Sequence, residues 1–179
     1  MDILLAILFV IAGLIALILI IALFSKKEYA VERQIIINKP RQKVFDYIRF
    51  LKNQEQYSKW VMMDPNVRRD YRGTDGTVGF VAAWDSDIKD VGKGEQEIKN
   101  LKEGERMDLE IRFVKPFKSI SPAYMTTETV ADSTTKVRWG FNGKMPYPMN
   151  AMLLFINIPE LLGKDLEISL NNLKGVLEK

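Results

Sequence analysis

The sequence PELLGKDLEISLNNLKGVLE, residues 159–178, decides the fold of this chain. Its leucines recur every three or four positions, at Leu162, Leu166, Leu170, Leu173 and Leu177. This spacing places them on one face of an α-helix. Because a helix with one apolar face must bury that face, the stretch predicts a long carboxy-terminal helix packed on another layer of structure.

The residues between 66 and 143 supply a sheet for this helix to pack on. Their alternating segments are separated by turn residues at a spacing of about 8–12 residues, which is typical of antiparallel strands. Thr74-Asp75-Gly76 and Asp132-Ser133 are two such turns. The expected strands are Val67–Arg72, Val78–Trp84, Gly94–Leu101, Arg106–Phe113, Pro122–Val130 and Thr135–Gly143.

A smaller unit precedes these strands. Tyr29–Ile37 alternates as a strand, and Pro40 suits the first turn of the helix that follows, which has Val44 and Phe45 on its apolar face. A second short helix or irregular segment is expected over Asn53–Trp60. The predicted class is therefore α+β, with an antiparallel sheet wrapped around a long final helix.

Ile3–Phe24 is an apolar run without any charge, and as a helix it would be roughly 33 Å long, enough to cross a bilayer. A cleaved signal peptide is the competing interpretation. It is disfavoured because no basic residue precedes the run and no small-residue cleavage site follows it. Residues 1–27 are thus expected to form a transmembrane anchor and residues 28–179 one domain. Lys26 and Lys27 favour a cytoplasmic location for that domain.

The composition narrows the possible chemistry. The chain has 179 residues, a formal net charge of +3, and neither Cys nor His, which excludes thiol and histidine catalysis and the usual zinc sites. Its charges alternate in sign, so nucleic-acid binding is not expected. Asp85, Asp87 and Asp90 do not follow the calcium-loop pattern, because Lys89 occupies a ligand position. No metal and no cofactor is predicted.

Several stretches resemble the START-like superfamily, also described as SRPBCC or polyketide cyclase/dehydratase-like proteins. The matching stretches are Ile35-Ile36-Ile37-Asn38-Lys39-Pro40, Val44-Phe45-Asp46-Tyr47-Ile48, Tyr57-Ser58-Lys59-Trp60, Lys115-Pro116-Phe117, Gly163-Lys164-Asp165 and Leu170-Asn171-Asn172-Leu173-Lys174. The resemblance implies a helix-grip fold with a mostly apolar cavity between sheet and final helix. It also implies a membrane-anchored member, but it selects no single activity and carries over no catalytic residues.

The candidate cavity residues are large apolar side chains on or beside the strands and at the start of the final helix. They are Trp60, Met63, Phe80, Trp84, Phe113, Tyr124, Trp139, Phe141, Met149, Met152 and Phe155. Each could equally fill a core, since large pockets are few per protein. Methionine is flexible and polarizable, which suits a pocket for ligands of variable shape.

Residues 145–158 form the most unusual segment of the expected domain. Met152-Leu153-Leu154-Phe155-Ile156 has no polar face, which is typical of a segment that is fully buried or that faces something other than water. Burial beneath the sheet is expected. The alternative is a gate over the cavity that dips into the bilayer beside the anchor.

The leading hypothesis is a membrane-anchored domain that binds a small hydrophobic molecule or a lipid. The first alternative is a cyclase- or dehydratase-type enzyme that acts on an apolar substrate. Its acid–base groups would come from Glu95, Glu97, Asp108, Glu110, Glu128, Tyr124 and Tyr147. Strand alternation suggests that most of these carboxylates face solvent. The second alternative is a protein-interaction module without a ligand.

Overall fold

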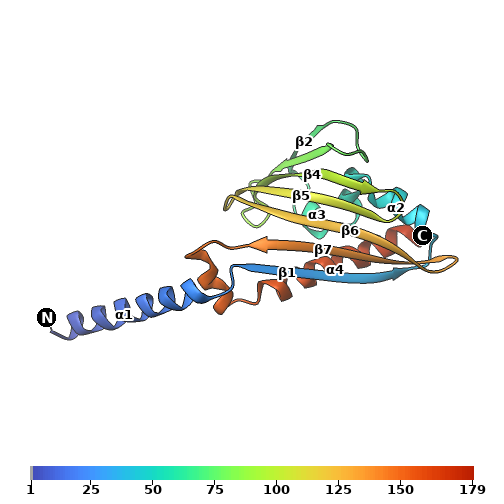
Figure 1. The fold of residues 1–179 in the computed structure, drawn as a ribbon. Coiled ribbons are helices and arrows are strands. Elements are labelled where there is room, and N and C mark those ends of the chain that lie inside the picture. The colour runs from blue at the N-terminus through green and yellow to red at the C-terminus, as the bar shows by residue number, and fades with distance from the viewer. Residues whose placement is uncertain (1) are drawn as a thin grey trace.

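The computed structural model describes residues 2–179 and contains one antiparallel sheet, one long helix against its inner face, and a separate amino-terminal helix (Figure 1). The elements are α1 (Asp2–Phe24), β1 (Glu28–Ile37), α2 (Arg41–Ile48), the 3-10 helix η1 (Leu51–Gln56), α3 (Lys59–Met62), β2 (Arg68–Arg72), β3 (Val81–Asp85), β4 (Lys93–Lys102), β5 (Arg106–Lys115), β6 (Ser119–Ala131), β7 (Thr134–Lys144), the 3-10 helix η2 (Met149–Leu154) and α4 (Ile158–Leu177). The predicted α+β helix-grip class is confirmed.

The sheet is a meander whose first strand closes onto its last. The strand order is β1-β7-β6-β5-β4-β3-β2, and every neighbouring pair is antiparallel. All six strands expected between residues 67 and 143 are present. Most boundaries differ by no more than two residues, and two differ by three: β6 begins earlier than expected, at Ser119, and β3 begins later, at Val81, because Gly79 takes a positive φ of 87°. Such a backbone bend interrupts the strand pattern.

Helix α4 packs its leucine stripe on the sheet, as its spacing predicts. Leu166, Leu170 and Leu173 are at most 1% exposed. The helix begins cleanly because the Asn157 side chain accepts a hydrogen bond from the backbone N–H of Glu160 at 3.2 Å. Helix α4 packs against β1, α3 and η1, and the face of the sheet that it covers is the inner face.

The core fills only one half of that inner face. Ile37, Val137, Met125, Met107 and Ile98, which lie toward the end of the sheet where β1 ends, are fully buried. Toward the opposite end, where β1 begins, several inward residues of the same strands are only half-buried, namely Tyr29, Ile111, Phe113 and Phe141. Helix α2 covers the first half, and nothing of comparable size covers the second.

The expectation that residues 145–158 lie buried beneath the sheet is wrong. Phe155 is 71% exposed, and Leu154 and Met152 are exposed as well. The segment does not lie between the sheet and α4, because η2 packs against the last turn of α1 instead. Its lack of a polar face therefore reflects an apolar outer surface, not a core position.

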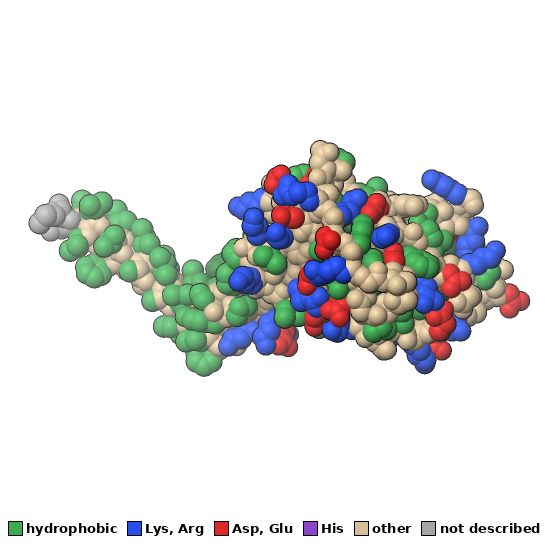
Figure 2. Space-filling model, turned by 90° about the horizontal axis from the view of Figure 1, so that it is seen from above, with side chains coloured by type: hydrophobic (Ala, Val, Ile, Leu, Met, Phe, Trp, Pro, Cys, Tyr) green, Lys and Arg blue, Asp and Glu red, His purple; other side chains and the backbone are tan. Residues whose placement is uncertain are grey.

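Helix α1 projects from the domain as an apolar rod (Figures 1 and 2). It is long and apolar enough to cross a membrane by length and composition. Most of its large side chains are exposed along its whole length, for example Leu4, Leu14 and Phe24. Among residues 2–179, only the carboxy-terminal end of α1 packs on the domain, through η2.

We predict that Leu170→Ala destabilises the domain by about 2–5 kcal/mol, because it leaves a cavity under a fully buried side chain. The matched control is Leu161→Ala on the same helix, where the side chain is 59% exposed and the expected change is within about 0.5 kcal/mol. Urea unfolding of the full chain in detergent, followed by tryptophan fluorescence, measures both. Equal losses for the two variants would contradict the burial of the leucine stripe.

Candidate ligand-binding cavity

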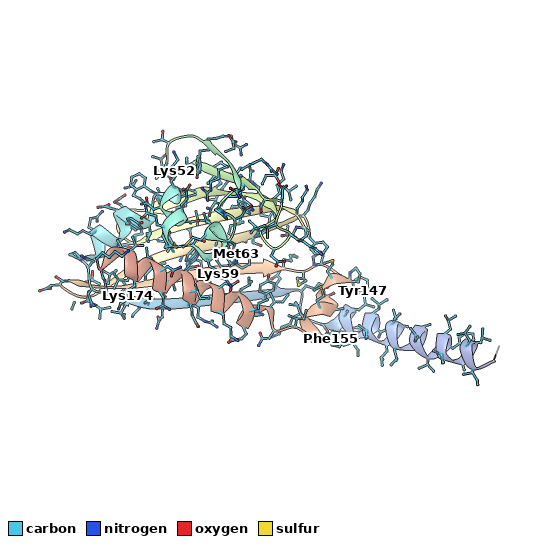
Figure 3. The ribbon with its side chains drawn as sticks, turned by 180° about the vertical axis from the view of Figure 1, so that it is seen from behind. Lys52, Lys59, Met63, Tyr147, Phe155 and Lys174 are labelled. Carbon is cyan, nitrogen blue, oxygen red and sulfur yellow. The ribbon has the colours of Figure 1, made fainter. Side chains whose placement is uncertain are left out.

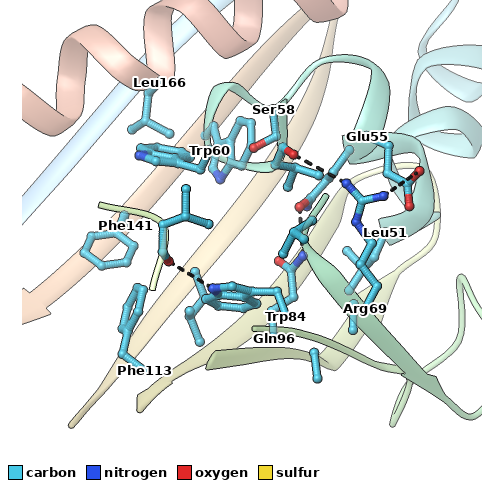
Figure 4. Close-up of a pocket in the computed structure, with 18 of the residues that line it drawn as sticks. Leu51, Glu55, Ser58, Trp60, Arg69, Trp84, Gln96, Phe113, Phe141 and Leu166 are labelled. Carbon is cyan, nitrogen blue, oxygen red and sulfur yellow. Dashed lines mark hydrogen bonds and ion pairs between the residues drawn. The ribbon is translucent and has the colours of Figure 1, made fainter. Parts of the chain in front are cut away.

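A cavity of about 300 Å³ lies between the sheet and α4, in the half of the inner face that the core does not fill (Figure 4). Its lining comes from β1, η1, α3, the strands β2 to β5, β7 and the start of α4. The lining residues are Val31, Leu51, Gln54, Glu55, Ser58, Trp60, Val61, Val67, Arg69, Tyr71, Ala82, Ala83, Trp84, Asp90, Val91, Gln96, Ile111, Phe113, Trp139, Phe141, Leu162 and Leu166. The volume is at the lower end of the range for small-molecule sites.

Aromatic rings line much of the wall. Phe113 contacts Trp84 on one side and Phe141 on the other, edge to face, with ring centroids 6.0 and 6.4 Å apart. Trp60 meets Trp139 in the same manner at 6.1 Å. The chain has three tryptophans, and all of them line the cavity. Such rings offer a large apolar surface with fixed geometry.

Trp84 is held in place by its neighbours. Its indole Nε1 donates to the backbone carbonyl of Val91 at 3.1 Å. The facing residue on β4 is Gly94, where an added Cβ would lie 2.6 Å from the indole ring. Glycine at this position therefore gives the ring room to lie across the neighbouring strand.

A buried amide pair provides the polar part of the wall. Gln96 Nε2 donates to Gln54 Oε1 at 2.8 Å, and the two residues are 9% and 3% exposed. Gln54 Nε2 is buried and lies within full hydrogen-bond geometry of no acceptor among residues 2–179, although the Gln54 side chain is close enough to the Tyr57 hydroxyl to act on its pKa, which burial raises. An unsatisfied buried donor costs about 1–3 kcal/mol, so a ligand acceptor at this atom would remove a real penalty.

Glu55 and Arg69, two of the three charged residues at the wall, are occupied by each other and by Tyr71. The third, Asp90, is exposed in the β3–β4 connection and forms no ion pair among residues 2–179. Glu55 accepts a hydrogen bond from the Tyr71 hydroxyl at 2.5 Å and forms an ion pair with Arg69 at 3.2 Å. Burial and the bond to Glu55 raise the pKa of Tyr71 to about 12, so its hydroxyl stays protonated. Glu55, Arg69 and Tyr71 thus form a structural cluster at the edge of the cavity.

The carboxylates considered for catalysis on β4 and β5 lie on the outer face of the sheet. Arg112 bonds Glu95 and Glu97 at 2.7 Å each and Glu110 at 2.5 Å. The Arg112 hydrogen bonds hold the pKa of Glu95 and Glu97 below its usual range, which keeps them ionised. The expectation that these carboxylates face away from the core is confirmed.

Asp108 and Glu128 are likewise paired with neighbouring cations, Asp108 with Arg106 at 2.7 Å and Glu128 with Arg138 at 2.9 Å. Tyr147 is exposed, beyond the end of β7. None of these three lines the cavity.

Five of the eleven candidate cavity residues line the cavity: Trp60, Trp84, Phe113, Trp139 and Phe141. They belong to four different elements, and the sheet register brings them together. Trp84 and Phe113 both face Gly94, while Phe141 pairs with Val31 across β1 and β7.

Three further candidates lie elsewhere in the domain. Phe80 is 1% exposed and does not line the cavity, but its ring stacks on that of Tyr71, which does. Tyr124 points to the outer face, where its hydroxyl donates to Glu32 at 2.5 Å, because it alternates with the buried Ala123 and Met125. Met63 follows α3 and is 37% exposed (Figure 3).

Met149, Met152 and Phe155 are also outside the cavity. Met149 and Met152 belong to η2, which packs on α1, and Phe155 follows it. Apolar character alone could not distinguish residues that line a cavity from residues that pack on a neighbouring helix.

The sequence analysis missed the polar residues of the cavity. Gln96 could have been found, because on β4 it alternates in phase with the buried Ile98. Gln54 lies in the short 3-10 helix η1, which has no useful periodicity, and its inward orientation depends on tertiary packing.

Comparison with known proteins shows the fold of the domain. No family model and no curated protein sequence matches this chain. Solved structures do match: a protein from Nitrosospira multiformis has 17% identity and a TM-score of 0.57, over 83% of this chain and 96% of that one.

Two further matches have assigned names. Ara h 8.0201 has 16% identity and a TM-score of 0.54, over 84% of this chain and 97% of its own. The Aha1 dimer structure from Colwellia psychrerythraea has 13% identity and a TM-score of 0.57, over 84% and 96%. At these identities the likeness extends to the architecture alone. This chain therefore has the helix-grip fold of these proteins, with an additional apolar helix at its amino terminus.

Proposed function

We propose that this protein is a membrane-anchored binding domain for a small amphiphile, with the apolar part of the ligand among the cavity aromatics and an uncharged polar group at Gln54. The observation that carries the proposal is the unpartnered, buried Gln54 Nε2 in the wall of a mostly apolar cavity. A donor in this position favours a ligand hydroxyl or carbonyl oxygen.

The anchor in this proposal is α1. The mostly exposed stretch Ile3–Phe24 of this helix carries no charge, so it has no favourable environment in water and a matching one in a bilayer. Tethering raises the effective concentration of the domain near membrane-dissolved ligands, so a modest affinity is sufficient.

Binding is favoured over the enzyme alternative by the state of the acid–base groups. The carboxylates on β4 and β5 are paired on the outer face, and Glu55 at the cavity is occupied by Tyr71 and Arg69. Asp90, the other carboxylate in the lining, is unpaired in the part of the chain that the structure describes, but it is exposed to solvent in the β3–β4 connection and not enclosed in the cavity. A general base needs a free carboxylate within reach of substrate. The interaction-module alternative predicts that the cavity never takes up a ligand.

We predict that a medium-chain alcohol brominated at its tail quenches the fluorescence of Trp60, Trp84 and Trp139. Gln54→Met should weaken this binding by about 2- to 10-fold, which corresponds to one neutral hydrogen bond of about 0.5–1.5 kcal/mol. A brominated alkane of the same length has no acceptor, so its affinity should not fall in the variant. Fluorescence titration of the full chain in detergent measures both constants.

Gln56→Met is the matched control, because Gln56 lies on the same 3-10 helix but is exposed and bonds the Tyr47 hydroxyl. It should leave the alcohol affinity unchanged. Absence of quenching in the unmodified protein would contradict ligand binding. Equal affinities in the Gln54 and Gln56 variants would contradict the role of the amide.

We predict that the domain faces the cytoplasm, since Lys26 and Lys27 directly follow the apolar helix. Green fluorescent protein fused after Lys179 should fluoresce in a bacterial host, and alkaline phosphatase fused at the same position should be inactive. The opposite pair of results would reverse the orientation. Recovery of both fusions in the soluble fraction would contradict the anchor.

A further inference from the structure

One end of the domain lies next to the carboxy-terminal end of α1, and we call it the anchor end. It comprises residues 25–27, 86–92, 116–118 and 145–156, which connect α1 to β1, β3 to β4, β5 to β6, and β7 to α4. The register brings these connections together, since Glu28 pairs with Lys144, Phe113 with Ser119 and Asp85 with Lys93. Figure 1 shows this end beside α1.

The segment around η2 is fixed to the end of α1 by polar contacts. Asn150 is fully buried, and its Nδ2 donates to the carbonyl of Ala22 at 2.6 Å. Met145 N–H donates to the carbonyl of Lys27 at 2.8 Å. The last carbonyls of a helix have no partner within it, so Asn150 also satisfies one of these groups. This contact sets η2 at the level of the last turn of α1.

That level is the edge of the bilayer if α1 crosses it. A helix of 23 residues is about 34 Å long and the hydrocarbon layer about 30 Å thick, so the last turn of α1 lies near the headgroups. Side chains fixed beside Ala22 would lie within the same region.

The segment presents its apolar side chains outward at that level. Phe155 is 71% exposed and Ile156 44%, with Leu154, Met152 and Tyr147 each exposed by more than 40%. Figure 3 shows Tyr147 and Phe155 at the base of α1, pointing away from the domain. A cluster of large exposed apolar residues is typical of a surface that contacts another protein or a membrane.

Lysines accompany these apolar side chains. Lys26 and Lys27 follow α1, and Lys115 and Lys118 flank the β5–β6 loop, in which Phe117 is 60% exposed. Basic residues near an apolar contact are attracted to anionic headgroups by about 1 kcal/mol each. Apolar side chains bordered by lysines are typical of elements that lie in the membrane interface.

Part of the cavity wall lies at the anchor end of the domain. Its lining includes Val91 in the β3–β4 connection, Val67 just before β2, and Leu162 in the second turn of α4. Phe113 and Phe141, close to the ends of β5 and β7 beside the anchor, are only half-buried. The fully packed half of the grip lies at the other end.

We propose that the anchor end is a second membrane contact, in which the 147–156 segment and the Phe117 loop lie in the bilayer interface and hold the mouth of the cavity against the lipid. This inference rests on the proposed insertion of α1. It deepens the proposed function by assigning the ligand to the membrane phase: the amphiphile passes between bilayer and cavity without crossing bulk water.

The absence of native cysteine allows a single fluorophore to be placed at will. We would label Phe155→Cys, Leu14→Cys and Val130→Cys separately with an environment-sensitive dye, each in the full chain reconstituted into phosphatidylcholine and phosphatidylglycerol vesicles. Leu14 reports the insertion of α1. Val130 is also an exposed apolar residue, but it lies on the β6–β7 hairpin at the opposite end.

We predict that doxyl-labelled lipids quench the dyes at positions 14 and 155 and that iodide does not. The dye at position 130 should show the reverse. A dye at 155 quenched by iodide would overturn the second contact while leaving the anchor in place. Protection of that dye from both quenchers would mean that protein covers the segment, which also overturns the inference. A dye at 14 that lipid does not quench would refute the insertion of α1 itself.

Discussion

The burial of one helix face under a curved sheet is the constraint on which this structure depends. The leucine stripe of α4 and the apolar face of α2 together fill one half of the inner sheet, and residues such as Ile37 and Met125 are completely buried there. The seven strands extend beyond the reach of α2. Because a single helix cannot cover so wide a sheet, the remaining half is lined by aromatic rings around a cavity.

The polar groups divide between the two faces of the sheet, and the proposed binding function rests on this division. Outside, Arg112 ties several carboxylates into one network. Inside, the cavity has an amide pair whose buried donor, Gln54 Nε2, has no partner. A neutral amide can orient a ligand without ionising it. The proposed fixation of the cavity mouth at the membrane gives such a site direct access to amphiphiles that water dissolves poorly.

Local sequence patterns predicted the elements, and tertiary packing decided the site. Leucine spacing identified α4, alternation identified the strands, and the apolar run identified α1, because each of these signals is contained in one segment. The cavity joins short stretches of many segments. Hydrophobicity therefore selected Phe113 and Phe141, which line it, and also Phe155, which does not. Tyr124 could have been assigned to the outer face from its alternation with Met125. No local pattern could place Gln54.

Native mass spectrometry of the full chain, extracted from cells with its surrounding lipid and released gently, tests the central claim most directly. The account predicts a population of the protein with one small amphiphile bound per chain, and a smaller fraction of that adduct when Gln54 is replaced by methionine and the variant is extracted in the same way. Spectra that contain only the bare chain, under conditions in which annular lipids still remain attached to α1, would contradict it.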